Sequence, residues 1–314
     1  MTMATKTDGT LWVWGWNLAG QLGLNQEGHA PGARSSPTQI PGTWGDALFT
    51  GTGWTHATKA DGTLWAWGNG YGDGYTAQNN RVRYSSPVQI GSATDWGTTR
   101  GKLSGALAIK TNGELWGWGQ DAYGKLAQNI STGLSYSSPI QIPGTTWSTL
   151  RAYVYAFAAV KTDGTLWVAG YNQYGKFGQN NTTNYSSPIQ IPGTWKDLNG
   201  GGMRDFSGFI NTDNELWMMG HNNYGFLGQN DTTTYSSPIQ VPGSWDQIGF
   251  SHYTTMGIKT DGTSWVWGRT SGADGAGVLG LNAGVDYSSP VQLPGTDWDQ
   301  PTGARSQMFA LLKN

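Results

Sequence analysis

The chain repeats one pattern six times along its 314 residues. Each copy has a version of Asp-Gly-Thr-Leu-Trp-x-Trp-Gly, followed by a version of Tyr-Ser-Ser-Pro-x-Gln-Ile-Pro-Gly-Thr-Trp. The copies begin at Asp8, Asp61, Asn112, Asp163, Asp213 and Asp261, and their prolines are Pro37, Pro87, Pro139, Pro188, Pro238 and Pro290. A unit of about 50 residues cannot bury its own apolar face, so neighbouring units must stack. The repeat therefore predicts a propeller or a solenoid.

The copy from Trp147 to Pro192 shows what one repeat contributes. It predicts a strand over 156–161, a tight Asp-Gly turn, a returning strand over 165–170 and an edge strand over 187–191. A further strand follows the Pro-Gly turn, over 194–198. Four strands per repeat is the content of one propeller blade.

Tryptophan is concentrated at the repeated positions, which hold 16 of the 18 tryptophans. In the strand Leu11-Trp12-Val13-Trp14, both faces are apolar, so both need a cover. A blade lies between two neighbours and meets that need. We expect these indoles to pack between blades and to be the main source of stability.

Composition narrows the class of protein further. The chain has 49 glycines, no cysteine and only 12% charged residues, which favours turns and aromatic strands over charged helices. A net charge of −2 gives no general attraction for nucleic acid, so no nucleic-acid partner is expected. No apolar stretch reaches about 18 residues, and residues 1–20 already carry the repeat pattern, so neither membrane insertion nor an ordinary signal peptide is expected.

The two ends of the chain carry copies of the same strand, Met3–Lys6 and Met308–Asn314. Pairing across the ends would close a ring and remove exposed sheet edges. The fold prediction is an all-β, closed six-bladed β-propeller of four-stranded blades with a composite first blade. It forms a single domain over 1–314, of six repeats of about 51 residues. A seventh blade, or an incomplete extra blade begun by the C-terminal copy, is the less favoured alternative.

Several segments resemble the regulator of chromosome condensation repeat family. They are Asp163–Trp167, Trp67-Gly68-Asn69 and Gly15–Gly23. The resemblance covers nearly the whole chain and implies a β-propeller, commonly seven-bladed in that family. Its members act as exchange factors for small GTPases, as propeller-type inhibitors of β-lactamase, or as plant ultraviolet-B photoreceptors, and the shared fold does not select among these.

The sequence also departs from the family pattern. That pattern usually has a histidine seven residues before the Asp of each turn, where this chain has Trp54, Gly105, Ala156, Phe206, Thr254 and Met308. The photoreceptor segment Gly-Trp-Arg-His-Thr is approached only by Gly53–His56. No long insertion is present to form an exchange-factor wedge. The loop before each turn has therefore been remodelled.

Function is expected where the copies disagree, because shared positions serve packing. The loop before each Asp-Gly turn is the most divergent and would line one rim of the propeller. The predicted partner-binding rim comprises Trp54, His56, Arg100, Lys102, Arg151, Tyr153, Tyr155, Arg204, Asp205, Phe206, Phe250, His252, Tyr253 and Arg305. Arginine and tyrosine are common anchors at protein interfaces, and arginine also binds carboxylates and phosphates. The alternative is that these residues are solvated side chains on the surface with no role in binding.

A second candidate surface is the Asn-rich loop, as in Tyr174–Asn181 and Tyr224–Asn230. Tyrosine, asparagine and glutamine suit glycans, since rings stack on sugars and amides bond hydroxyls. The same residues recur in every copy, which favours a set of turns instead. The longest version, over 269–286, is either a functional loop or a tolerated insertion.

Catalytic and metal-binding patterns are sparse. The four histidines show no metal-ligand spacing, and Ser35-Ser36-Pro37 recurs six times without a nearby histidine. We therefore expect no enzyme activity, no metal and no cofactor.

Two interpretations remain from the sequence. The favoured one is a non-enzymatic recognition or structural propeller, a phage virion or bacterial surface component that binds a protein or glycan through a loop rim. The alternative is an intracellular, cytoplasmic regulator of a partner protein, resembling a GTPase exchange factor or an enzyme inhibitor. Both interpretations use the same fold, so only the functional site can decide between them.

Overall fold

The computed structural model covers residues 1–314, which form two compact units. Unit 1 comprises 1–162 with 185–188, and unit 2 comprises 163–184 with 189–314. Each unit is described by itself. The described residues are all except 29–31, 52, 71, 98–102, 105–106, 131–132, 154, 197, 199–204, 252–253, 271–278, 282–283, 297, 305–306 and 313–314.

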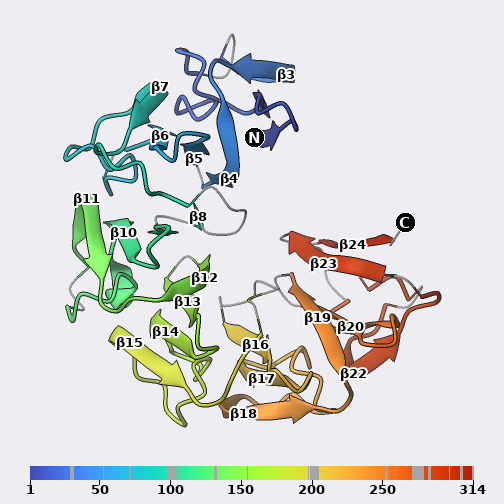
Figure 1. Ribbon diagram of the computed structural model, residues 1–314. Coiled ribbons are helices and arrows are strands. Elements are labelled where there is room, and N and C mark those ends of the chain that lie inside the picture. Colours follow the sequence, from blue (N-terminus) through green and yellow to red (C-terminus); the bar gives the residue numbers. More distant parts are fainter. Residues whose placement is uncertain are drawn as a thin grey trace. The chain divides into compact units, whose positions relative to one another are not determined.

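Unit 1 is built from antiparallel sheets that follow the repeats (Figure 1). The first sheet has β1 (Thr2–Thr5), β2 (Leu11–Gly15) and β3 (Arg34–Ile40). The second has β4 (Trp44–Thr50), β5 (Trp54–Lys59), β6 (Leu64–Gly68) and β7 (Tyr84–Gln89), and the third has β8 (Leu103–Ser104), β9 (Leu107–Ile109), β10 (Leu115–Gln120) and β11 (Ser135–Ile142). The fourth repeat adds β12 (Trp147–Ala152) paired with β13 (Ala156–Lys161).

Unit 2 continues the same pattern. It contains β14 (Leu166–Gly170), and β15 (Tyr185–Ile191) is divided between the units. One sheet has β16 (Phe206–Ile210), β17 (Leu216–Gly220) and β18 (Tyr235–Val241), and the next has β19 (Trp245–Phe250), β20 (Thr254–Lys259), β21 (Ser264–Gly268) and β22 (Tyr287–Gln292). A pair of strands, β23 (Trp298–Ala304) and β24 (Gln307–Leu312), ends the unit.

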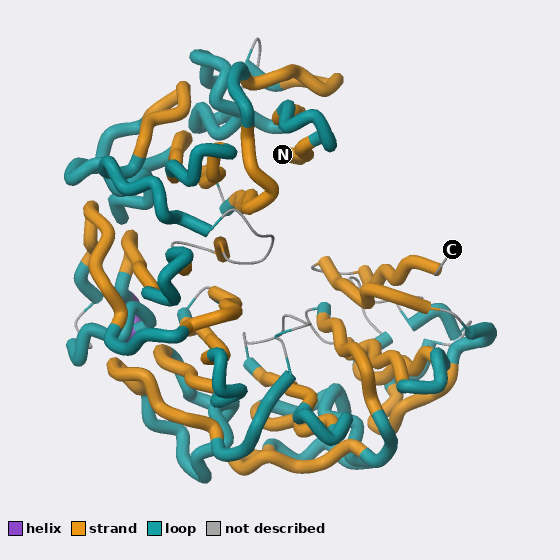
Figure 2. The backbone as a smooth tube through the Cα atoms, viewed as in Figure 1, coloured by secondary structure: helices purple, strands orange, loops and turns teal. Residues whose placement is uncertain are grey.

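The all-β prediction is confirmed. Among the described residues the single helical element is a 3₁₀ turn at Ala122–Gly124, and strands and loops make up the rest (Figure 2). None of the described residues form a helix long and apolar enough to cross a membrane.

The copies of one strand at the two ends each have a local partner. β1 pairs with β2, placing Met3 opposite Val13, while β24 pairs with β23, placing Leu312 opposite Trp298. β23 and β24 thus make a two-stranded sheet of their own, the arrangement expected of an extra, incomplete blade. Six blades, ring closure and a single domain stay predictions.

In four repeats, the Asp-Gly turn is held by a chain of hydrogen bonds from Asp through Thr to a tryptophan, and in the third and fifth repeats a glutamate takes the place of the Thr. The Thr10 backbone N–H and hydroxyl both donate to Asp8 Oδ1, at 2.9 and 2.7 Å, and the Trp12 indole donates to Thr10 Oγ1 at 2.9 Å. Gly9 has a φ of 80°, which glycine adopts without strain. The first tryptophan of each copy therefore fixes the turn and lies half-buried rather than in the core.

A second set of bonds joins consecutive repeats and explains the Ser-Ser-Pro segment. In unit 2, the Asn230 N–H donates to Ser288 O at 2.7 Å, and the Ser289 hydroxyl donates to Asn230 Oδ1 at 3.0 Å. The same two bonds link Asn25, Asn79, Asn129 and Asn180 to the next repeat's serines. All five asparagines have a positive φ. This inter-repeat clamp is the structural role of the paired serines.

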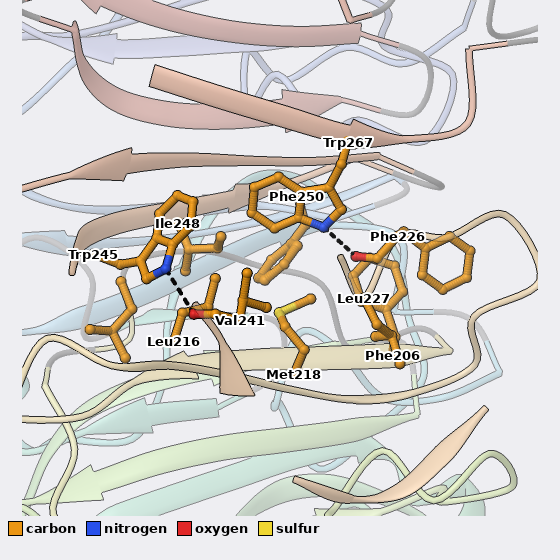
Figure 3. Close-up of a cluster of buried hydrophobic side chains, with 11 residues drawn as sticks. Phe206, Leu216, Met218, Phe226, Leu227, Val241, Trp245, Ile248, Phe250 and Trp267 are labelled. Carbon is orange, nitrogen blue, oxygen red and sulfur yellow. Dashed lines mark hydrogen bonds between the residues drawn. The ribbon is translucent and has the colours of Figure 1, made fainter. Parts of the chain in front are cut away.

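The tryptophans of the core lie between repeats, as the sequence predicts. In unit 2, Leu216, Met218 and Val241 of one repeat pack with Trp245 and Trp267 of the next (Figure 3). The Trp267 indole donates to Phe226 O in the preceding repeat at 2.9 Å, as Trp67 does to Gln21 O at 2.8 Å in unit 1. One repeat thus supplies an acceptor carbonyl and part of an apolar core. The next repeat supplies the indole N–H donor and the rest of the apolar side chains.

Changing Asn230 to Ala tests the inter-repeat clamp. We expect a loss of about 1–2 kcal/mol in unfolding free energy, because Ala is strained at φ 61° and the Ser289 bond is lost. Asn230→Gly is the matched control, since glycine accepts that φ and loses only the side-chain bond. Urea unfolding of the two variants should rank Ala below Gly. An Ala variant as stable as wild type would contradict the clamp.

Candidate functional site

Unit 1 carries a group of aromatic rings beside the loops before the Asp-Gly turns. The Trp54 ring stacks on Tyr75, with centroids 4.9 Å apart and planes 8° apart, and also lies 5.4 Å from Phe49. His56 Nε2 lies 2.7 Å from Tyr75 O, and the Trp118 indole donates to the same carbonyl at 2.9 Å. Trp54 and His56 are buried, so these rings form a rigid base and not the surface itself.

The exposed residues of this site are a tyrosine pair and an arginine on the strand that leads into the second tyrosine's loop. Tyr123 and Tyr155 are each 42% exposed, and their rings meet edge to face at 5.2 Å. Tyr123 has a φ of 61°, in the short 3₁₀ turn, which is uncommon for a bulky residue. Arg151 is exposed on β12, and the Tyr153 N–H donates to Ala156 O at 2.8 Å to turn the chain toward β13.

Charged groups are buried close to Tyr75 and in the loop that carries Tyr123. Lys125 is 9% exposed, and its Nζ lies 6.0 Å from the Tyr75 ring centroid. Burial lowers the pKa of Lys125 to about 8, against the opposing effect of Asp121 and Asp73. Burial also raises the pKa of Asp121, which accepts the Leu126 N–H at 2.7 Å, and raises that of Tyr75 to about 12.

The structure describes eight of the 14 predicted rim residues. Arg151, Tyr153 and Tyr155 lie together on unit 1, and Asp205 lies half-buried in unit 2. Four predicted surface residues are instead buried: Trp54, His56, Phe206 and Phe250. The remainder lie outside the described residues: Arg100, Lys102, Arg204, His252, Tyr253 and Arg305.

The four buried residues are a correction with a simple geometric reason. Trp54 and Phe206 each open the second strand of a repeat, where the side chain points into the interior. Phe206 stacks on Phe226 at 4.5 Å and meets Phe250 edge to face at 5.3 Å. Trp54 and Phe206 are thus packed in the interior of their units.

The amides of the Asn-rich loops are used to hold the loops themselves. Asn172 and Asn222 are fully buried, and their Oδ1 atoms accept the Phe177 and Leu227 N–H groups at 2.9 Å. The Gln179 amide donates to the carbonyls of Phe177 and Gln190, both at 3.2 Å. Groups bonded in this way are not offered to sugar hydroxyls, which favours the turn interpretation over a glycan site.

Sequence reasoning did not single out Tyr75, Tyr123 or Lys125. Each occupies a loop position that differs between copies, and Lys125 corresponds to Gln21, Tyr75, Lys176 and Phe226 in other repeats. That disagreement was the available signal. The part of the chain that the structure describes has no cluster of three His, Asp or Glu side chains that could hold a metal.

Comparison with known proteins places this architecture. The family model for the Regulator of chromosome condensation (RCC1) repeat matches residues 8–48. The chain is an RCC1-like β-propeller. Over 149 residues it is 26% identical to the ultraviolet-B receptor UVR8 of Arabidopsis thaliana, a match covering 45% of this chain and 32% of the receptor. The chain thus spans about a third of that relative's length.

Solved structures agree with the fold over nearly the whole chain. Prp20p of Saccharomyces cerevisiae superposes with a TM-score of 0.73 at 16% identity, covering 99% of this chain and 80% of Prp20p. Human WBSCR16 gives a TM-score of 0.74 at 17% identity, covering 99% and 83%. At these identities the likeness establishes the RCC1-like fold, and the function must be argued from the site.

Proposed function

We propose that this RCC1-like propeller is a non-enzymatic regulator that binds a partner protein through the surface formed by Arg151, Tyr153, Tyr155 and Tyr123. The observation that carries the proposal is the exposed tyrosine pair, with Arg151 exposed four residues before Tyr155 in the chain. Tyrosine and arginine dominate binding energy at protein interfaces, above all where the free surface is already rigid.

The comparisons support a protein partner in preference to a virion or cell-surface ligand. Prp20p is described by its binding to Gsp1p and histones, and yeast RCC1 has been solved bound to Kap60. No comparison supports the phage or surface interpretation, which the sequence had favoured. The regulator interpretation, which was the alternative, now has the better support. Regulation of a small GTPase is the finer form of the proposal.

Changing Arg151 and Tyr155 to Ala together should weaken partner binding at least about tenfold, because both anchors are exposed and can be removed without opening the core. A photo-crosslinking amino acid at Tyr123 would first identify the partner by mass spectrometry. Titration calorimetry of wild type and variant against that partner then measures the loss.

Arg83→Ala, at an exposed arginine on another loop of unit 1, is the matched control and should bind as wild type does. If the double variant kept full affinity for the partner, the proposal that this surface binds the partner would be contradicted. Accelerated nucleotide release from a small GTPase would identify an exchange factor, whereas a stable complex with a slowed enzyme would identify an inhibitor.

A further inference from the structure

Most repeats place a lysine ammonium over their own tryptophans. Lys59 Nζ lies 3.7 Å from the Trp65 ring centroid and 5.4 Å from that of Trp44. The same arrangement recurs in Lys110 with Trp96 and Trp116, both at 5.3 Å, and in Lys259 with Trp245 and Trp265, at 5.2 and 4.0 Å. Lys6 over Trp12 and Lys161 over Trp147 follow at 4.5 and 4.9 Å. In the second, third and sixth repeats, two indole rings therefore form a built-in cation site.

The fifth repeat keeps both tryptophans but has Asn211 where the other copies have lysine. The short Asn211 side chain turns back to the hairpin. Its Oδ1 accepts the backbone N–H groups of Asp213 and Glu215 at 3.1 and 2.8 Å, and its Nδ2 donates to Glu215 Oε2 at 2.7 Å. No side chain of this position therefore reaches over the rings of Trp195 and Trp217.

A cavity of about 410 Å³ lies at this place in unit 2. Its walls include the two tryptophans, Asn211, Gly178 and Pro238. The next layer differs from the second and sixth repeats, because Met219 stands where those strands have Trp67 and Trp267, and the Phe209 ring meets Trp195 edge to face at 5.8 Å. A thinner side chain beside Gly178 leaves more room than an indole does.

The charge around the cavity suits a cation. Glu215 Oε2 lies 3.3 Å from the Trp217 indole nitrogen, so a carboxylate stands at the edge of the aromatic wall. The nearby Lys196 is engaged elsewhere, with its Nζ bonded to Asn214 and 3.6 Å from Asp246 Oδ1. Two indole faces with one carboxylate match an alkylammonium group, which is attracted by both the ring faces and the anion.

We propose that the cavity between Trp195 and Trp217 binds an alkylammonium group from outside the chain, namely a lysine side chain of a partner protein, free or methylated. The incoming ammonium takes the place that Lys59, Lys110 and Lys259 fill in their own repeats. This site lies in unit 2 and is independent of the tyrosine and arginine surface proposed above. A free quaternary amine shares the same chemistry and is the other source to be separated by experiment.

The test uses three short peptides that differ only at one residue: lysine, trimethyl-lysine and acetyl-lysine, with choline chloride as the small amine. Indole N–H signals in NMR titrations report binding at Trp217. The lysine and trimethyl-lysine peptides should shift that signal to saturation, and the neutral acetyl-lysine peptide should bind at least about tenfold more weakly. A response to choline and to neither charged peptide would assign the same chemistry to free amines and reject a partner lysine.

Asn211→Lys is the decisive variant, because it supplies the lysine found in the other repeats. We expect it to raise the unfolding midpoint and to lower peptide affinity at least about tenfold. Trp217→Ala should lose binding for a different reason, the removal of one ring face.

Three results would overturn the proposal: equal binding of the acetyl-lysine peptide, unchanged binding by Asn211→Lys, or tighter binding of a proline-rich peptide than of either charged one. The Arg151 and Tyr155 double variant should bind the peptides as wild type does. A negative result for the cavity therefore does not contradict the proposed surface on unit 1, and a negative result for that surface does not contradict the cavity.

Discussion

Trp267→Ala is expected to lower the free energy of unfolding by about 3–5 kcal/mol. The Trp267 side chain is fully buried between two repeats of unit 2, where it meets the Trp245 ring at 5.6 Å. Its removal leaves a large cavity and takes away the indole that donates to Phe226 O at 2.9 Å. The Thr255 hydroxyl still donates to that carbonyl at 2.9 Å, so the cavity is the larger part of the cost. Urea unfolding followed by circular dichroism measures the change.

Two variants separate this role from the mere loss of an indole. Trp265→Ala removes the neighbouring half-buried tryptophan of β21, whose indole donates to Thr263 Oγ1 at 2.9 Å, and should cost clearly less. Trp267→Met introduces the residue that repeat five has at this position, Met219. Its loss of unfolding free energy should lie between those of the two alanine variants. If both alanine variants lost the same stability, inter-repeat packing would not be the main stabilising contribution.

The sequence predicted the repeat and its strands well, because hairpin chemistry is local. Asp163-Gly164 marks a turn by its own residues, and the strand predicted at 156–161 is observed as β13 with those bounds. The edge strand was predicted over 187–191 and begins earlier, at Tyr185. Pro188 can lie inside this strand because the outer side of an edge strand needs no N–H donor. The strand predicted at 194–198 is described as a single bridge between Trp195 and Asn211.

The candidate site was less predictable, because burial depends on neighbours that the pattern does not reveal. Trp54 and Phe206 stand out as divergent residues, yet their place at the start of a second strand turns them inward. Tyr123 shows the reverse case, since its exposure depends on a turn with φ 61°. Arg151, on β12, and Tyr155, in the connection to β13, are both exposed at positions that differ between the copies, and their role in partner binding stays a prediction.

Lys176 is the buried cation whose behaviour the structure predicts most sharply. It is 1% exposed in a loop of unit 2, with its Nζ 5.3 Å from the Tyr171 ring centroid and 5.8 Å from that of Phe177. Burial lowers the pKa of Lys176 to about 7, although Asp205 acts in the opposite direction. The unfolded chain keeps the ordinary pKa of 10.5. Between these two values the unfolded state binds more protons than the folded state.

Stability should therefore rise with pH between about 7 and 10.5, by about 1.4 kcal/mol per pH unit at most from this group, and should level off outside that range. Lys176→Met keeps an unbranched side chain and removes the titrating group, so the part of the rise that begins near pH 7 should disappear. The variant should gain about 1–4 kcal/mol at pH 6, where wild type still buries the charge.

Lys125 has a pKa lowered to about 8 in unit 1 and adds to the same rise in wild type. For that reason Lys125→Met is the matched control: it should remove only the share of the rise that Lys125 contributes above about pH 8, whereas Lys176→Met removes the share that begins near pH 7. Unfolding midpoints in urea at half-unit steps from pH 6 to 10 would distinguish the two. A Lys176→Met curve parallel to that of wild type would show that the ammonium of Lys176 is solvated in the folded protein.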